Sequence, residues 1–199
     1  MMVKPFSQAC VDNREPILAV LKRVFAQQTR VLEIGSGTGQ HAVYFAENLP
    51  HLHWQTSDLP GNHGGIRAWL DDYSGNNVGA PLTVDVREPI KNITPVDAIF
   101  SANTAHIMTW DTVQSFFQQL PLLLVPGGVL VLYGPFNYHG KYTSESNQQF
   151  DAYLKQNNPL QGIRDFEAID ALAKQANLSL LEDNPMPANN RLLVWQKAF

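Results

Sequence analysis

A nine-residue segment near the start of the chain, Val31 to Gly39, constrains the fold more than any other. It reads V-L-E-I-G-S-G-T-G, so a short apolar run with β-strand character leads into glycines at alternate positions. Glycine lets the backbone adopt unusual conformations and approach a ligand closely, because it carries no Cβ. The segment therefore predicts a strand, a tight turn and a helix, with a ligand above the turn.

The spacing of the glycines distinguishes between kinds of ligand. The dinucleotide fingerprint is G-x-G-x-x-G, whereas here the third glycine comes one residue early and Gln40 stands where that pattern requires glycine. Glu33 precedes the glycines, and this acidic residue before G-x-G-x-G resembles motif I of class I S-adenosylmethionine-dependent methyltransferases. A glycine-rich turn that binds no ligand is the alternative.

Apolar runs and helical periodicity alternate along the rest of the chain. The pattern predicts helices at residues 14–28, 38–48, 65–73, 111–124, 145–156 and 165–176. It predicts strands at 30–34, 52–56, 82–86, 96–101, 129–133, 178–182 and 191–196. Such alternation favours an open, mostly parallel α/β sheet.

The two C-terminal strands lie close together in sequence and predict an antiparallel hairpin, which is also how the class I methyltransferase fold ends. We therefore expect a Rossmann-like α/β fold with a mostly parallel seven-stranded sheet. We expect one methyltransferase-like domain over residues 1–199, with an N-terminal helical cap over 1–28 and a substrate-side insertion over 135–165.

Acidic and polar residues stand at the ends of successive predicted strands, where ligands of open α/β sheets bind. Asp58 lies 19 residues beyond Gly39, and its carboxylate can accept bonds from both hydroxyls of a ribose. The resemblance implies that Asp85 reaches the adenine amine, with the Val86 backbone near the ring, and that Asn103 meets the methionine end. Either aspartate could instead be a helix N-cap or a turn residue.

The resemblance implies S-adenosyl-L-methionine as the cofactor. The expected cofactor-binding residues are Glu33, Gly35, Ser36, Gly37, Gly39, Asp58, Leu59, Asp85, Val86 and Asn103.

Five further segments resemble a single bacterial and eukaryotic family. They are residues 13–18 (N-R-E-P-I-L), 101–107 (S-A-N-T-A-H-I), 133–137 (Y-G-P-F-N), 140–147 (G-K-Y-T-S-E-S-N) and 162–165 (G-I-R-D). This family is catalogued as "domain of unknown function 938", and its animal members are called methyltransferase-like protein 26. The resemblance covers nearly the whole chain and implies the same fold and cofactor, while it leaves the methyl acceptor open.

Methyl transfer requires a nucleophile held in line with the methyl group, and a base only if that nucleophile starts protonated. His106, on the loop after the fourth predicted strand, is the candidate catalytic base, although a packed loop histidine is the alternative. The candidate substrate-side residues are Arg14, Asn137, Tyr138 and Tyr142. A guanidinium such as that of Arg14 suits a carboxylate, but a solvated helix start explains it equally well.

The expected acceptor lies between the loops after the fourth and fifth strands and the N-terminal helix. After the fourth strand the chain reads S-A-N-T rather than the N/D-P-P-Y/F pattern of methyltransferases that modify nucleobase or glutamine nitrogen. This departure argues against those two acceptors.

Composition limits the partners and the compartment. The net charge is −4 and no basic run stands out, so we expect no nucleic acid. Cys10 is the single cysteine, which excludes an intramolecular disulfide and a Cys-rich metal site, and we expect no metal. The longest apolar stretches are too short to cross a bilayer, and the first ten residues lack the apolar core of a signal peptide. We expect a cytoplasmic protein that does not contact membranes.

The sequence thus predicts S-adenosylmethionine-dependent methyl transfer to a small molecule or a side chain. One alternative is a module that binds the same cofactor without turnover, as a sensor or as support for a partner protein. A nicotinamide-dependent reductase is a second alternative, which the glycine spacing disfavours. The sequence leaves the oligomeric state open.

Overall fold

The computed structural model describes residues 4–199. Its α-helices are α1 (Gln8–Val24), α2 (Gln40–Asn48), α3 (His63–Leu70), α4 (Trp110–Leu123), α5 (Glu145–Asn157) and α6 (Phe166–Gln175). Its strands are β1 (Arg30–Glu33), β2 (His53–Asp58), β3 (Val78–Thr83), β4 (Val96–Ala102), β5 (Leu124–Gly134), β6 (Phe136–Asn137), β7 (Arg164–Asp165), β8 (Leu178–Met186) and β9 (Asn190–Lys197). The short 3-10 helices are η1 (Pro60–Asn62) and η2 (Pro187–Asn189).

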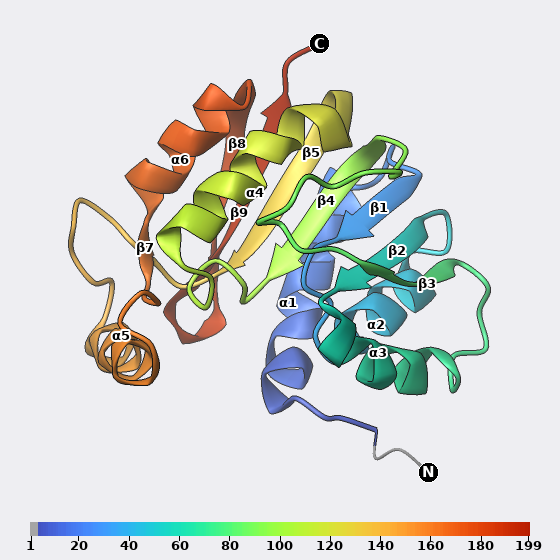
Figure 1. The fold of residues 1–199 in the computed structure, drawn as a ribbon, viewed down its shortest axis with the longest axis horizontal. Helices are drawn as coiled ribbons and strands as arrows, with labels where there is room; N and C mark the ends of the chain where they lie inside the picture. The colour runs from blue at the N-terminus through green and yellow to red at the C-terminus, as the bar shows by residue number, and fades with distance from the viewer. Residues whose placement is uncertain (1–3) are drawn as a thin grey trace.

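The main sheet has seven strands in the order β3-β2-β1-β4-β5-β9-β8, and β6 and β7 form a separate two-stranded sheet (Figure 1). The first five strands in that order pair in parallel, whereas β9 pairs antiparallel with both β5 and β8. The predicted fold class, a mostly parallel sheet that ends in an antiparallel hairpin, is confirmed.

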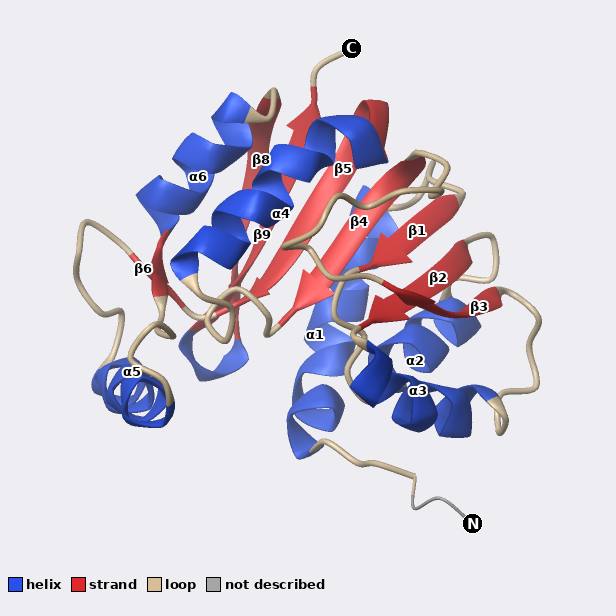
Figure 2. Cartoon of the chain, viewed as in Figure 1, coloured by secondary structure: helices blue, strands red, loops and turns tan. Residues whose placement is uncertain are grey.

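Helices cover both faces of the sheet, with α4 and α6 on the near face in Figure 2 and α1 and α2 behind it. The two faces have separate apolar cores, one containing Phe117 and Trp195 and the other Phe45 and Trp54. Strand β1 contributes Leu32 to the first core and Val31 to the second. A central strand buried on both faces is mostly apolar on both, which is why Val31 and Leu32 of β1, and Ala98, Ile99 and Phe100 of β4, are consecutive apolar residues.

Three predicted boundaries were wrong: those of the third strand, the fifth strand and the N-terminal helix. The third strand is Val78–Thr83, so Asp85 lies beyond it; the Cα partner of Thr83 is Asp58, the last residue of β2. The fifth strand starts at Leu124 and includes Pro126 to Gly128, because a register shift opposite β4 accommodates these residues.

The N-terminal helix was predicted at 14–28, but α1 runs from Gln8 to Val24. Pro16 therefore lies inside the helix rather than in its first turn. The missing N–H of a proline leaves the carbonyl four residues earlier without a helical partner. Here that residue is Asp12, which is exposed, so water can satisfy its carbonyl.

The predicted cap over 1–28 corresponds to α1, although residues 1–3 lie outside the described part of the chain. The predicted insertion over 135–165 contains β6, α5 and β7. That these parts belong to one domain stays a prediction. Among residues 4–199, no helix combines the length and apolar character needed to cross a bilayer.

Candidate functional site

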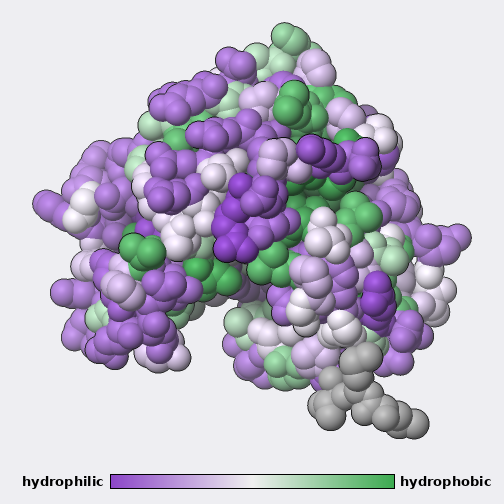
Figure 3. All heavy atoms as spheres, in the orientation of Figure 1, coloured by the Kyte–Doolittle hydropathy of each residue, from purple (hydrophilic) through white to green (hydrophobic). Residues whose placement is uncertain are grey.

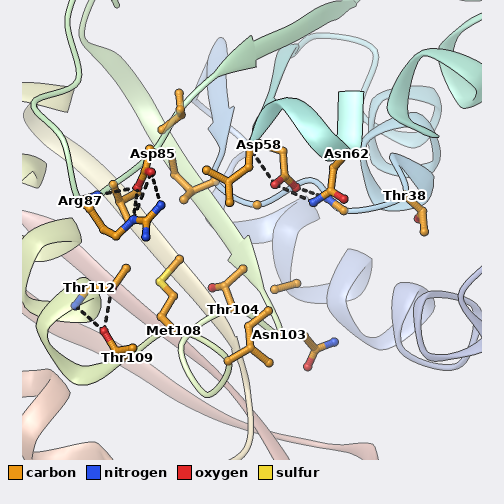
Figure 4. A pocket seen from close by; sticks show the side chains of 18 of the residues that line it. Thr38, Asp58, Asn62, Asp85, Arg87, Asn103, Thr104, Met108, Thr109 and Thr112 are labelled. Atoms are coloured by element: carbon orange, nitrogen blue, oxygen red, sulfur yellow. Dashed lines mark hydrogen bonds and ion pairs between the residues drawn. The ribbon is translucent and has the colours of Figure 1, made fainter. Parts of the chain in front are cut away.

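A cleft of about 510 Å³ lies at the carboxyl ends of the parallel strands. Figure 4 shows the side chains that line it, which come from the glycine turn, the end of β2, the segment after β3 and the loop after β4. The cleft brings together most of the predicted cofactor-binding residues: Gly35, Gly37, Asp58, Leu59, Asp85, Val86 and Asn103.

The three glycines of the turn have positive φ angles, and each meets a different environment. A Cβ on Gly35, at φ +75°, would lie 2.6 Å from Cγ2 of Thr104. A Cβ on Gly39, at φ +89°, would lie 3.1 Å from the Cα of Ile66 in α3. A Cβ on Gly37, at φ +57°, would meet nothing within 4 Å, and this glycine lines the cleft. The outer two glycines thus allow close packing, and the middle one faces open space.

The Asp58 carboxylate is fixed against the glycine turn. Its Oδ2 accepts a hydrogen bond from the Gly37 backbone N–H at 2.7 Å. Its Oδ1 accepts from the Leu59 N–H at 2.7 Å and from Nδ2 of Asn62 at 2.8 Å. Asp58 therefore has the turn role that the sequence left open, and it still lines the cleft. A carboxylate has about four acceptor positions, so about one remains for a ligand.

Asp85 faces the same cleft but is paired with Arg87 (Figure 4). Its two oxygens accept from Nε of Arg87 at 2.9 and 3.1 Å, and from Nη2 at 2.5 Å. These bonds from the guanidinium lower the pKa of Asp85, which keeps the carboxylate ionised. Arg87 was not predicted as a site residue, and its spacing two residues after Asp85 was the one available signal.

The end of β4 is joined to the glycine turn by side-chain bonds. Ser101 Oγ donates to the Ile34 carbonyl at 2.6 Å and also contacts Oγ1 of Thr104 at 2.7 Å. Asn103 adopts a left-handed conformation at φ 57°, which asparagine tolerates better than most residues. The following loop adds Thr104, Ile107 and Met108 to the lining, none of which the sequence analysis selected.

Three predicted cofactor residues, Glu33, Ser36 and Gly39, are not among the residues that line the cleft. Glu33 is 2% exposed because β1 is a central strand with an apolar core on each face. Its Oε2 accepts from Nε1 of Trp54 at 3.1 Å. Burial raises the pKa of Glu33 to about 7. Ser36 is also buried, and its Oγ accepts from the Ser57 N–H at 3.1 Å. The Glu33 and Ser36 side chains therefore stabilise the turn from the side that faces away from the cleft.

His106 is buried, and its side chain is not part of the cleft lining. Its ring lies edge-on to Phe150 of α5, with 5.4 Å between the ring centroids. Burial, together with the nearby Arg164 guanidinium, lowers the pKa of His106 to about 4, so the imidazole is neutral at pH 7.

The predicted substrate-side residues are not gathered at the cleft. The Arg14 guanidinium lies over the Tyr44 ring at 4.5 Å, beside a smaller pocket between α1, α2 and α3. Tyr138 donates to Asp183 and Tyr142 donates to Asp151, each at 2.7 Å. Asn137, in β6, is buried, and its Oδ1 has no hydrogen-bond partner within residues 4–199. Each of these side chains is engaged or enclosed locally, a tertiary outcome that the loop sequence did not reveal.

Within residues 4–199, no three His, Cys, Asp or Glu side chains are grouped so that they could hold a metal ion.

Solved structures of methyltransferases share this fold. An O-methyltransferase family protein from Burkholderia thailandensis is 17% identical, with a TM-score of 0.81, over 92% of this chain and 56% of that one. An O-methyltransferase family 2 protein from Planctomyces limnophilus, in complex with apigenin, is 16% identical, with a TM-score of 0.79, over 94% and 56%. An O-methyltransferase from neocarzinostatin biosynthesis, in complex with S-adenosyl-L-homocysteine and 1,4-dihydroxy-2-naphthoic acid, is 16% identical, with a TM-score of 0.76, over 96% and 55%. The chain thus spans about half the length of these proteins, and the likeness concerns the fold.

The sequence itself matches a family over almost its full length. The match covers residues 4–197, from the segment before α1 to the last residue of β9. The chain therefore belongs to the family described as "Protein of unknown function (DUF938)".

Proposed function

We propose that this protein binds S-adenosyl-L-methionine in the cleft and transfers its methyl group to a small-molecule or side-chain acceptor. The observation that carries the proposal is the glycine turn at the end of β1, bonded through Gly37 to the Asp58 carboxylate at the end of β2. This arrangement lies at the carboxyl edge of a sheet with the methyltransferase strand order, where open α/β sheets bind nucleotides.

The residues of the cleft fit this cofactor. The volume of about 510 Å³ is within the range of about 300–1,000 Å³ that is usual for ligand sites. Ile34, Val84 and Met108 give the cleft apolar walls that suit a flat heterocycle. Gly37 has open space where a Cβ would stand, so the backbone of the turn can approach a bound molecule.

Each polar residue of the cleft then has a role. Asp58 would accept from the ribose hydroxyls, and the exposed Asn62 amide, which shares Oδ1, could move aside for them. Asp85 and the Val86 backbone would meet the adenine, with Arg87 fixing the Asp85 carboxylate. Asn103 would meet the methionine end.

When bound, S-adenosylmethionine supplies a methyl group on a positively charged sulfur. The protein's contribution is to hold the acceptor in line with that group and to exclude water, and positioning of this kind can supply about 7–11 kcal/mol in model reactions. We place the acceptor beside Ile107, which lines the cleft, on the side of the loop where Phe150 of α5 packs on His106. The notch beside α5 at the lower edge of the molecule in Figure 3 offers an approach from that side. His106 stays the proposed base for an acceptor that arrives protonated; its neutral imidazole is buried outside the cleft lining, so such an acceptor has to extend past Ile107 to reach it.

Three observations concern the acceptor, the partners and the compartment. Two of the similar proteins were solved with apigenin and with 1,4-dihydroxy-2-naphthoic acid, which supports a small-molecule acceptor here. The net charge of −4 and the absence of a basic run give no support for a nucleic acid partner. A single cysteine agrees with a reducing compartment, so we propose that the protein is cytoplasmic.

The first experiment is calorimetric titration with S-adenosylmethionine, S-adenosylhomocysteine and NADH. We expect micromolar dissociation constants for the first two, which correspond to about −8 kcal/mol, and no binding of NADH. Binding of NADH alone would favour the reductase. Binding of S-adenosylmethionine without transfer to any acceptor in a broad screen would favour a sensing or partner-binding module.

Two matched aspartates test the assignment of the ribose. Asp58→Ala should weaken S-adenosylhomocysteine binding by about 1–3 kcal/mol, the range for losing bonds to a charged group. Asp97 also accepts bonds from backbone N–H groups, those of Thr29 and Arg30, but it stands near the start of β4, away from the cleft. Asp97→Ala should lower stability and leave the affinity unchanged. Equal dissociation constants for the two variants would refute the role of Asp58.

A further inference from the structure

The loop from Asn103 to Thr109, between β4 and α4, forms one wall of the cleft, and its backbone carbonyls are bound from outside it. Ala105, His106, Ile107 and Met108 are consecutive, and the carbonyl of each accepts a hydrogen bond from a residue between 161 and 164. The loop thus obtains the donors for four successive carbonyls from a segment more than 50 residues away in sequence.

The donors belong to the G-I-R-D segment, which the sequence analysis singled out, and to the residue before it. Arg164 donates from Nε to the Ala105 carbonyl at 3.1 Å and from Nη2 to the Met108 carbonyl. The Gly162 N–H donates to the His106 carbonyl at 3.0 Å. Gln161 donates from Nε2 to the Ile107 carbonyl at 2.8 Å. We call residues 161–164 the clamp.

The clamp is itself held by α5. The Ile163 N–H donates to Oδ1 of Asp151 at 2.7 Å, and Asp151 is 2% exposed. Tyr142 and Lys155 donate to its other oxygen at 2.7 and 2.6 Å. The clamp therefore joins the buried carboxylate of α5 to the loop that presents Ile107 and Met108 to the cleft.

We propose that Arg164 is a positioning residue for the cleft: it fixes the Asn103–Thr109 loop in the conformation that binds the cofactor. Its planar guanidinium reaches two carbonyls of the loop at once, and it also donates to the Leu160 carbonyl at 3.1 Å. A lysine ammonium is a single point on a flexible stem and cannot bridge both carbonyls in this way. The identity of the ligand rests on the proposed function; the ordering of the loop does not.

The test compares Arg164→Lys with Arg30→Lys. Arg30 also donates to a backbone carbonyl, that of Pro95 at 2.6 Å, but it lies at the start of β1, at the opposite end of the strand from the glycine turn. Three quantities are measured for each variant: the dissociation constant of S-adenosylhomocysteine, hydrogen exchange of the amides from 103 to 109, and the urea midpoint.

For Arg164→Lys we expect binding weaker by about 5- to 30-fold, as for the loss of one or two such bonds, and faster exchange confined to the loop. Arg30→Lys should change neither. Gln161→Ala, which removes one bond only, should weaken binding by about threefold and serves if the arginine variant does not fold.

The outcomes separate the two proposals. Faster loop exchange with an unchanged dissociation constant would make Arg164 a structural residue only and overturn the inference, as would unchanged exchange. If the wild-type protein binds neither S-adenosylmethionine nor its product, the proposed function fails. Loop exchange in the free protein then still decides whether Arg164 orders the cleft wall.

Discussion

Replacing Gly35 by alanine tests the close packing of the glycine turn against the loop after β4. At φ +75°, an alanine there adopts a left-handed conformation, and its Cβ would lie 2.6 Å from Cγ2 of Thr104. That separation is far below ordinary van der Waals contact, and Thr104 is buried, so the turn and the loop must move apart.

The expected loss of stability has two parts. The left-handed conformation costs an alanine about 1–2 kcal/mol relative to glycine. Overpacking of this kind costs about 1–3 kcal/mol more, which gives roughly 2–5 kcal/mol in total. Gly37→Ala is the matched control, because φ is +57° but the Cβ would meet nothing within 4 Å. Gly37→Ala should therefore lose only the stability that the left-handed conformation costs an alanine, about 1–2 kcal/mol.

A second substitution, at Thr104, tests whether the overlap between the new Cβ and Cγ2 of Thr104 causes the loss of stability. Thr104→Ser removes Cγ2 and keeps the hydroxyl that contacts Oγ of Ser101 at 2.7 Å. Urea unfolding of the wild type, both single variants and the double variant gives the coupling energy. We expect Gly35→Ala/Thr104→Ser to recover about 1–3 kcal/mol of the loss. Strictly additive effects, or a Gly37→Ala loss as large as that of Gly35→Ala, would refute this account of the turn.

Two further predictions concern titratable groups. The folded-state pKa of Glu33, about 7, lies above its usual 4.5, so its stabilising contribution is complete below pH 4.5 and is lost as the pH rises through 7. Glu33→Gln should therefore abolish a loss of up to about 3 kcal/mol between pH 5 and 8, and urea midpoints that shift equally in both proteins would contradict this. His106→Ala should leave S-adenosylhomocysteine affinity nearly intact and abolish transfer, whereas weaker affinity would assign His106 to the cofactor site. Because the pKa of His106 is about 4, the wild-type rate should show no titration of this group between pH 5 and 8.

The sequence alone determined those features that depend on local pattern. A strand that ends in alternate glycines needs residues without Cβ at positive φ, and Gly35, Gly37 and Gly39 all have it. Alternating strands and helices favoured a parallel sheet, and the spacing from Gly39 selected Asp58 as a residue of the ligand site, where it lines the cleft. These features follow from chain geometry within one strand–helix–strand unit, so no distant contact was needed to infer them.

Tertiary structure decided the features that depend on which distant segments meet. The direction of a side chain at a strand end follows from pairing and pleat, so Glu33 turned into the core beside Trp54 while Asp58 faced the cleft. The clamp supports the cleft through contacts between segments more than 50 residues apart, and no pattern within the loop after β4 shows that its carbonyls are bound by Arg164. A sequence pattern reflects the conformation that each residue prefers locally, whereas the shape and charge of this cleft depend on contacts between segments that are distant in the sequence.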